Sequence, residues 1–176
     1  PPITQHGAYF EEVGFDTMIK RELGDAPLRI SNNVEQIERW ENIFDRIRRY
    51  RNKFLSQFMI GDFVLFYTAK RNEYNWFGMF DPSTRKPNGF VQGTYREEYV
   101  KSESIYPIIY ETVAIPLQWR MFKAFNHLSE NLHAKPIGCI NDFCAHKTDV
   151  MHKLQTGNMC QTCYNLALAA GLSASE

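Results

Sequence analysis

The stretch "CINDFCAHKTDVMHKLQTGNMCQTC", residues 139–163, contains all four cysteines of this 176-residue chain. They form two close pairs, Cys139-x4-Cys144 and Cys160-x2-Cys163, separated by fifteen residues. Two pairs brought together by one loop supply the four thiolates that Zn²⁺ accepts in a tetrahedral shell. The spacing therefore predicts a zinc site on Cys139, Cys144, Cys160 and Cys163.

A zinc ion held by four protein ligands is structural, because no position remains open for water or substrate. Its binding free energy is coupled to folding. Between the two pairs, Val150, Met151 and Leu154 follow helical spacing, which predicts a short helix over the site. We therefore expect a single zinc ion that stabilises the C-terminal region and takes no part in a reaction.

Other interpretations of the four cysteines remain open. Two disulfides require an oxidising compartment, and disulfide frameworks usually staple a whole chain rather than one end of it. A redox pair at Cys160 and Cys163 leaves the other pair without a role, and unrelated core cysteines seldom fall in such a pattern. The zinc interpretation favours a reducing compartment, so we expect a cytoplasmic protein.

The histidines of the C-terminal half are weaker candidates. His146 and His152 lie between the cysteine pairs and are alternative ligands in place of a cysteine, although a lone histidine on a short helix is usually a solvated residue. His127 and His133 flank Glu130. Their separation of six residues does not place them on one helical face, so a joint site requires the helix to end between them.

Length and composition indicate one packed domain over residues 1–176. Hydrophobic residues make up 44% of the chain and aromatic residues 14%, which favours a folded core over a disordered chain. The expected organisation is an N-terminal segment at 1–30, a long helix at 31–60, a sheet with central helices at 62–133, and a zinc-binding subregion at 134–172.

Charge and hydropathy restrict the partners. Twenty basic and twenty acidic residues cancel, which removes any global attraction to nucleic acid, and no apolar run is long enough to span a membrane. A basic cluster could still bind phosphates locally. Its members are Arg46, Arg48, Arg49, Arg51 and Lys53. A solvated helix face is the simpler interpretation, so nucleic acid is a disfavoured partner and protein the favoured one.

Two helices are expected in the N-terminal third. Apolar residues over 10–23 fall on one face and predict a short helix. From Val34 to Phe58 apolar residues recur at spacings of three, four and seven, with Asn32 as a plausible N-cap. This pattern predicts one long amphipathic helix that ends near Ile60.

The middle of the chain predicts a small sheet. Strands are expected at Asp62–Ala69, Tyr74–Phe80 and Gly89–Tyr95. The last two are joined by "DPSTRKPNG", which has the turn residues of a hairpin.

Helices follow the predicted sheet. The segment from Ser104 to Asn131 has helical periodicity, and Pro116 predicts that it divides into two helices near Ile115. A final helix is expected at Cys160–Leu172. The whole pattern predicts an α+β fold, with a small mixed sheet packed on helices and a C-terminal four-cysteine zinc site.

This order of elements resembles the metzincin-type zinc peptidases, and among them the archaemetzincins. The likeness is carried by the strand "DFVLFYT" (62–68), the helix that enters at "YPIIYETVA" (106–114) and the C-terminal cysteines, and it spans about residues 60 to 165. Such peptidases carry HExxHxxGxxH on a helix, followed by four cysteines that bind a second, structural zinc. The resemblance implies this scaffold here.

The residues that would bind the catalytic zinc in this resemblance are absent. Tyr110, Ala114 and Arg120 stand at the three histidine positions, and only Glu111 of the peptidase machinery remains. Without three ligands no metal lowers the pKa of a water for Glu111 to deprotonate. The resemblance therefore implies a degenerate peptidase.

Three functions follow as hypotheses. The first is a non-catalytic, zinc-stabilised interaction or regulatory module. The second is a metal-dependent hydrolase whose active site has moved, with Glu111, His127 or His133 in its cleft. The third is a nucleic-acid-binding protein that uses the basic helix at 46–53.

Overall fold

The computed structural model describes residues 37–59, 61–83, 86–93 and 106–172, all within one compact unit, Glu35–Glu176. The predicted helix over 10–23 and the predicted N-cap at Asn32 lie outside these residues.

The fold is α+β, as predicted. In chain order the described elements are α3 (Trp40–Lys53), a 3-10 turn (Leu55–Gln57), β1 (Val64–Thr68), β2 (Gly78–Phe80), β3 (Asn88–Gln92), α4 (Tyr106–Phe122), α5 (Phe125–Asn131), a second 3-10 turn (Lys147–Asp149), α6 (Val150–Thr156) and α7 (Gln161–Ala169).

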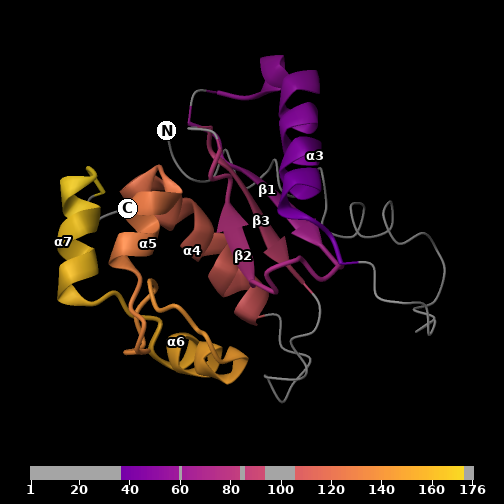
Figure 1. Ribbon diagram of the computed structural model, residues 1–176. Helices are drawn as coiled ribbons and strands as arrows, with labels where there is room; N and C mark the ends of the chain where they lie inside the picture. Colours follow the sequence, from indigo (N-terminus) through magenta and orange to yellow (C-terminus); the bar gives the residue numbers. More distant parts are fainter. Residues whose placement is uncertain (1–36, 60, 84–85, 94–105, 173–176) are drawn as a thin grey trace. The chain divides into compact units, whose positions relative to one another are not determined.

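The sheet is mixed, with the strand order β1-β3-β2 (Figure 1). β1 runs parallel to β3, with Val64 opposite Asn88 and Thr68 opposite Gln92. β2 pairs antiparallel with β3, so the predicted hairpin is confirmed. Every residue of β3 is buried, which is expected of a central strand with both faces covered.

Helices α3 and α4 cover opposite faces of the sheet. Successive residues of a strand point to opposite faces. On one face Phe90 meets Phe44 of α3, with ring centroids 5.6 Å apart. On the other face Gly89 lies under Ile115 of α4, where an added Cβ would stand 2.8 Å from the Ile115 Cγ2. The missing side chain of Gly89 therefore allows α4 to pack closely on the sheet.

The main core lies between these layers. Apolar burial of this kind is the dominant favourable term in folding. Its fully buried members are Ile43, Phe44, Ile47, Met79, Phe80, Phe90, Val91, Ile115, Phe122 and Leu128.

Helix α3 is shorter than the predicted range of 31–60. It begins at Trp40 because Glu38 is extended and donates its backbone N–H to the Arg71 carbonyl at 2.8 Å. The Glu73 carboxylate then accepts the backbone N–H of Trp40 at 2.8 Å. A distant loop thus caps the helix, which local sequence pattern cannot show. Its C-terminal end comes at Lys53.

Helix α4 is continuous through Pro116, so the predicted division near Ile115 is wrong. α4 packs on β2 and β3, and its buried residues lie on both sides of the proline, from Glu111 to Phe122. This burial holds one helix across Pro116. The break comes instead at Lys123, whose φ of 55° is left-handed. α5 follows directly. The predicted helices at 150–154 and at the C-terminus correspond to α6 and α7.

Arg51, on the last turn of α3, is a structural residue of the sheet edge. It is 5% exposed. Its guanidinium donates to the Asn88 side chain at 2.7 Å and to the carbonyls of Asp62 and Pro87 at 2.5 and 2.8 Å. The planar guanidinium of Arg51 therefore joins α3 to residues at and just before the starts of β1 and β3.

Replacing Arg51 with Met should lower the free energy of unfolding by about 2–4 kcal/mol, because buried acceptors lose their donor. Arg49→Met, at an exposed position of the same helix, should change it by less than about 0.5 kcal/mol. Urea unfolding followed by circular dichroism measures both. Equal effects of the two substitutions would contradict this role of Arg51.

No helix among the described residues is both long and apolar enough to cross a membrane.

Candidate metal centre

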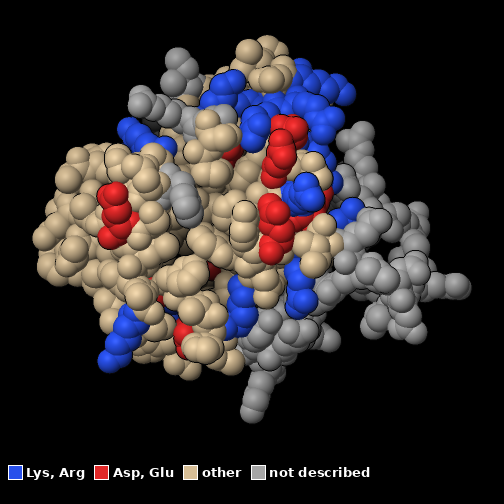
Figure 2. Space-filling view, viewed as in Figure 1, with Lys and Arg blue, Asp and Glu red and all other residues tan. Residues whose placement is uncertain are grey.

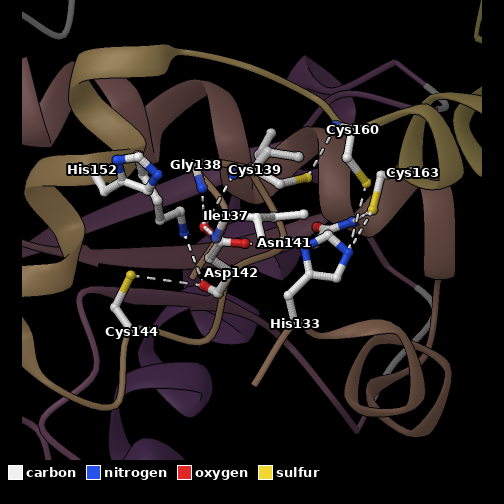
Figure 3. A network of polar contacts seen from close by, with 12 residues as sticks. His133, Ile137, Gly138, Cys139, Asn141, Asp142, Cys144, His152, Cys160 and Cys163 are labelled. Carbon is white, nitrogen blue, oxygen red and sulfur yellow. Dashed lines mark hydrogen bonds and ion pairs between the residues drawn. The ribbon is translucent and has the colours of Figure 1, made fainter. Parts of the chain in front are cut away.

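One group of histidine and cysteine side chains lies near the C-terminus with the dimensions of a metal site (Figure 3). One ring nitrogen of His133 and the Sγ atoms of Cys139, Cys160 and Cys163 all lie within 4.8 Å of one another. The His133 Nε2 is 3.7 Å from the Cys160 sulfur and 3.6 Å from the Cys163 sulfur. A tetrahedron with metal–sulfur bonds of about 2.3 Å and a metal–nitrogen bond of about 2.0 Å has nitrogen–sulfur edges of about 3.5 Å. The group therefore fits a tetrahedral ion.

Cys160 and Cys163 are positioned by α7. Cys160 directly precedes the helix as its N-cap residue and Cys163 lies in its first turn. A separation of three residues places both sulfurs on one side of the helix. The unpaired N–H groups and partial positive charge at a helix N-terminus stabilise thiolates there.

Cys139 is presented by a tight turn. Gly138 before it has a left-handed φ of 82°, which a residue without Cβ adopts without strain. The Thr156 hydroxyl at the end of α6 donates to the Gly138 carbonyl at 2.5 Å. The Ile140 N–H donates to the Asn158 carbonyl at 3.0 Å. These bonds hold the turn beside the segment that leads into Cys160.

His133 follows the end of α5 and is fixed by the same turn from its other side. Its backbone N–H donates to the Asn141 carbonyl at 2.9 Å, and the Phe143 N–H donates to the His133 carbonyl at 3.0 Å. The turn that carries Cys139 therefore contacts both the segment that carries His133 and the segment that leads into Cys160.

Asp142 joins the ligands to one another. Its side chain is fully buried, and its Oδ1 lies 3.0 Å from the His133 Nδ1. Its Oδ2 accepts the backbone N–H groups of Ile137, Gly138 and Cys139 at 2.8, 2.7 and 3.0 Å. A carboxylate that accepts the Nδ1 proton orients the ring and leaves Nε2 to bind a metal. Asp142 thus sets both the tautomer of His133 and the turn before Cys139.

The sulfurs also accept hydrogen bonds. The Cys160 N–H donates to the Cys139 Sγ at 3.3 Å, and the Asn141 amide donates to the Cys163 Sγ at 3.1 Å. Burial nevertheless raises the pKa of Cys163 to about 12. Burial acts the same way on Cys160, but hydrogen bonds from the Cys163 backbone and side chain lower its pKa below the ordinary value. A cation among the sulfurs would offset the cost of burying them as thiolates.

Cys144 lies outside this group, so the side chains that the structure brings together differ from the predicted four cysteines. Its Sγ is 3.8 Å from the Asp142 carbonyl oxygen and lies across Asp142 from Cys160 and Cys163 (Figure 3). Burial raises the pKa of Cys144 to about 11. His133 stands where the fourth sulfur was expected, because the turn at Asp142 directs Cys144 away. All four cysteines are free of disulfides.

The other predicted histidines do not join the group. His146 and His152 are exposed on the segment between Cys144 and Cys160. His127 is exposed on α5, with its Nδ1 3.3 Å from the Phe122 carbonyl oxygen. Sequence reasoning paired His127 with His133 and missed His133 as a partner of the cysteines. The available signal was its position six residues before Cys139.

The positions matched to the peptidase motif show no second metal site. Tyr110 and Ala114 pack beside Cys139 and Cys163, and Arg120 is exposed. Burial raises the pKa of the Tyr110 phenol above its ordinary range. Glu111 is buried, on the side of α4 that lines a cavity. Among the residues that the structure describes, the His133 group is the one that could hold an ion.

The basic cluster on α3 is largely engaged within the protein. Arg46 pairs with Glu38, and Arg48 pairs with Asp45 and Asp81. Red and blue side chains accordingly alternate on this face (Figure 2). With Arg51 buried, Arg49 and Lys53 are the cluster members left exposed without an acidic partner among the described residues.

Comparison of the chain with protein-family models, with curated proteins and with solved structures found no match. Function is therefore inferred from the geometry of the site.

Changing Asp142 to Asn should weaken metal binding about 10- to 100-fold, because the amide cannot serve both His133 and the three backbone donors as the carboxylate does. Competition with a chromophoric chelator measures the affinity. Asp149→Asn, whose side chain forms no cap hydrogen bond on the neighbouring helix, is the matched control and should leave it unchanged. Equal affinities of the two variants would contradict the positioning role of Asp142.

Proposed function

We propose that His133, Cys139, Cys160 and Cys163 bind a single structural zinc ion, and that the domain is a non-catalytic interaction or regulatory module. The observation that supports the metal site best is the agreement of the His133–sulfur distances, 3.6 and 3.7 Å, with the edges of a tetrahedron. Three thiolates and one imidazole form a recognised structural zinc set.

The donor set supports zinc over other common ions. Thiolate and imidazole are borderline-soft ligands, whereas Mg²⁺ and Ca²⁺ prefer oxygen. Four protein ligands also complete the tetrahedral shell, which leaves no position for a reacting water. This supports a stabilising role rather than a hydrolytic one.

The packing of the C-terminal region supports the same role. Apart from the proposed ligands, the buried apolar residues of the cluster around the site are Ala114 and Ile140. Tyr110, Leu117, Met121 and Met159 pack against them only partly buried, which is a small core for three chain segments. Structural zinc sites contribute about 10–16 kcal/mol of apparent binding free energy that becomes folding free energy. An ion would therefore replace the missing apolar contacts between α5, the turn and α7.

An interaction role is supported by the outer face of α4. Tyr106, Ile109 and Val113 follow helical spacing and are 73%, 49% and 56% exposed. Exposed apolar patches of this kind commonly mark partner surfaces.

We also propose that the scaffold is related to the metzincins with the catalytic metal lost. Support comes from the order of mixed sheet, Glu111-bearing helix and metal-binding C-terminus.

Purified protein should contain one zinc ion per chain. Cys163→Ser should weaken zinc binding more than about 100-fold, because it removes a direct ligand. Cys144→Ser is the matched control and should bind zinc normally. Elemental analysis and the sulfur-to-cobalt charge-transfer bands of the Co²⁺-substituted protein report both. If Cys144→Ser loses the metal and His133→Asn retains it, the proposed ligand set is wrong.

Removal of the metal with a strong chelator should expose residues 134–172 to limited proteolysis while the sheet and α3 stay protected, because the metal holds only the C-terminal segments together. Mass spectrometry of the fragments locates the cleavage sites. Unchanged cleavage of this region would refute the structural role. Peptide hydrolysis by the zinc-loaded chain that Glu111→Gln abolishes would refute the absence of catalysis.

A further inference from the structure

A cavity of about 320 Å³ lies on the other side of Asp142 from the metal group. Its walls come from the segment before β2, from α4, from the loop that carries Cys144, and from α6. Small-molecule sites in proteins commonly have volumes from about 300 Å³ upward. The cavity is therefore large enough for a ligand and separate from the metal ligands.

Two buried charges of opposite sign line this cavity without an ion-pair partner. Glu111 is 6% exposed and has no hydrogen bond or ion pair among the described residues. Lys153 is also 6% exposed. Its ammonium donates to the Asp142 carbonyl at 3.3 Å and lies 5.7 Å from the ring centre of Tyr110, with no carboxylate of the described residues in contact. Buried charges are normally paired, so both groups lack what a ligand could supply.

Glu111 and Lys153 both lie among the side chains that line the cavity, as does Cys144. Burial sets the raised pKa of the Cys144 thiol, while Lys153 lowers this pKa and Glu111 raises it. Glu111 and Lys153 form no ion pair with each other. Lys147, the other lysine of the cavity, is engaged with the Asn75 carbonyl and the Phe77 ring.

Aromatic side chains also line the cavity. Tyr74, Trp76 and Phe143 line it, and the rings of Trp76 and Phe143 meet edge to face with centroids 5.4 Å apart. Aromatic rings offer apolar area to a ligand and also attract a nearby cation. Beside the engaged groups of Asp142 and Lys147, the cavity thus combines the carboxylate of Glu111, the ammonium of Lys153 and aromatic side chains.

We propose that this cavity binds a free α-amino acid with an apolar side chain. Its ammonium group pairs with Glu111, its carboxylate pairs with Lys153, and its side chain packs against Trp76 and Phe143. At about 30 Å³ per water molecule, the cavity has room for about ten waters, comparable to leucine, methionine or phenylalanine. Neither Glu111 nor Lys153 is a metal ligand, but the wall that carries Phe143 and Lys153 belongs to the region that the proposed zinc ion stabilises, so the proposal is tested on zinc-loaded protein.

Isothermal titration calorimetry on the zinc-loaded chain tests the proposal with three related probes. L-Phenylalanine should bind, whereas L-phenylalaninamide, which lacks the carboxylate, and N-acetyl-L-phenylalanine, which lacks the ammonium, should each bind at least tenfold more weakly. These comparisons need no variant. Failure of phenylalanine, leucine and methionine to bind at millimolar concentration, or equal binding of the three probes, would overturn the proposal.

Variants assign each end of the ligand. Glu111→Gln should weaken phenylalanine binding at least tenfold and leave the weak binding of N-acetyl-L-phenylalanine unchanged, because that probe has no ammonium to lose a partner. Lys153→Met should also weaken phenylalanine binding at least tenfold, and it should leave the weak binding of L-phenylalaninamide unchanged, because that probe has no carboxylate. Glu130→Gln and Lys70→Met, at exposed positions, should bind like the wild type. Wild-type affinity in both cavity variants would overturn the assignment. Tighter binding of the peptide Phe-Gly-Gly than of phenylalanine would overturn a free amino acid as the ligand.

Metal content is measured in each sample. Amino-acid binding by a chain without zinc would contradict the proposed zinc function and leave this proposal intact. Zinc-loaded protein that binds no amino acid would contradict this proposal and leave the proposed zinc function intact.

Discussion

The buried carboxylate of Asp142 is the constraint on which the C-terminal half depends. One of its oxygens lies against the His133 ring and the other accepts three N–H groups of the turn before Cys139. Its backbone carbonyl accepts the Lys153 ammonium on the opposite side. One residue therefore connects the metal group to the neighbouring cavity.

The two halves of the described fold are held together differently. Around the sheet, large side chains such as Phe44, Phe80 and Phe90 fill both faces, and buried polar groups such as Arg51 find several partners. Around the metal group the buried apolar residues are few and small. An ion bound by the proposed ligands, which come from three segments, would supply there what apolar burial supplies in the sheet.

Local chemistry made much of this structure predictable. The β-rich runs and the turn residues between them predicted the strands and the hairpin, and the clustered cysteines predicted the region in which the structure places a group that could hold a metal ion. The predictions differ from the structure where a contact between residues far apart in the sequence determines the local structure. Glu73 caps α3 from another segment, the sheet carries α4 through Pro116, and the turn at Asp142 places His133 rather than Cys144 beside the other three cysteines. Each depends on tertiary contacts that spacing along the chain does not contain.

X-ray absorption spectroscopy at the zinc edge of the purified protein examines the ligand set most directly. The geometry predicts a first shell of three sulfurs at about 2.3 Å and one nitrogen at about 2.0 Å, with the outer-shell signature of an imidazole ring. A shell of four sulfurs would show that Cys144, rather than His133, is the fourth ligand. A shell with a bound water oxygen would contradict a closed, structural ion.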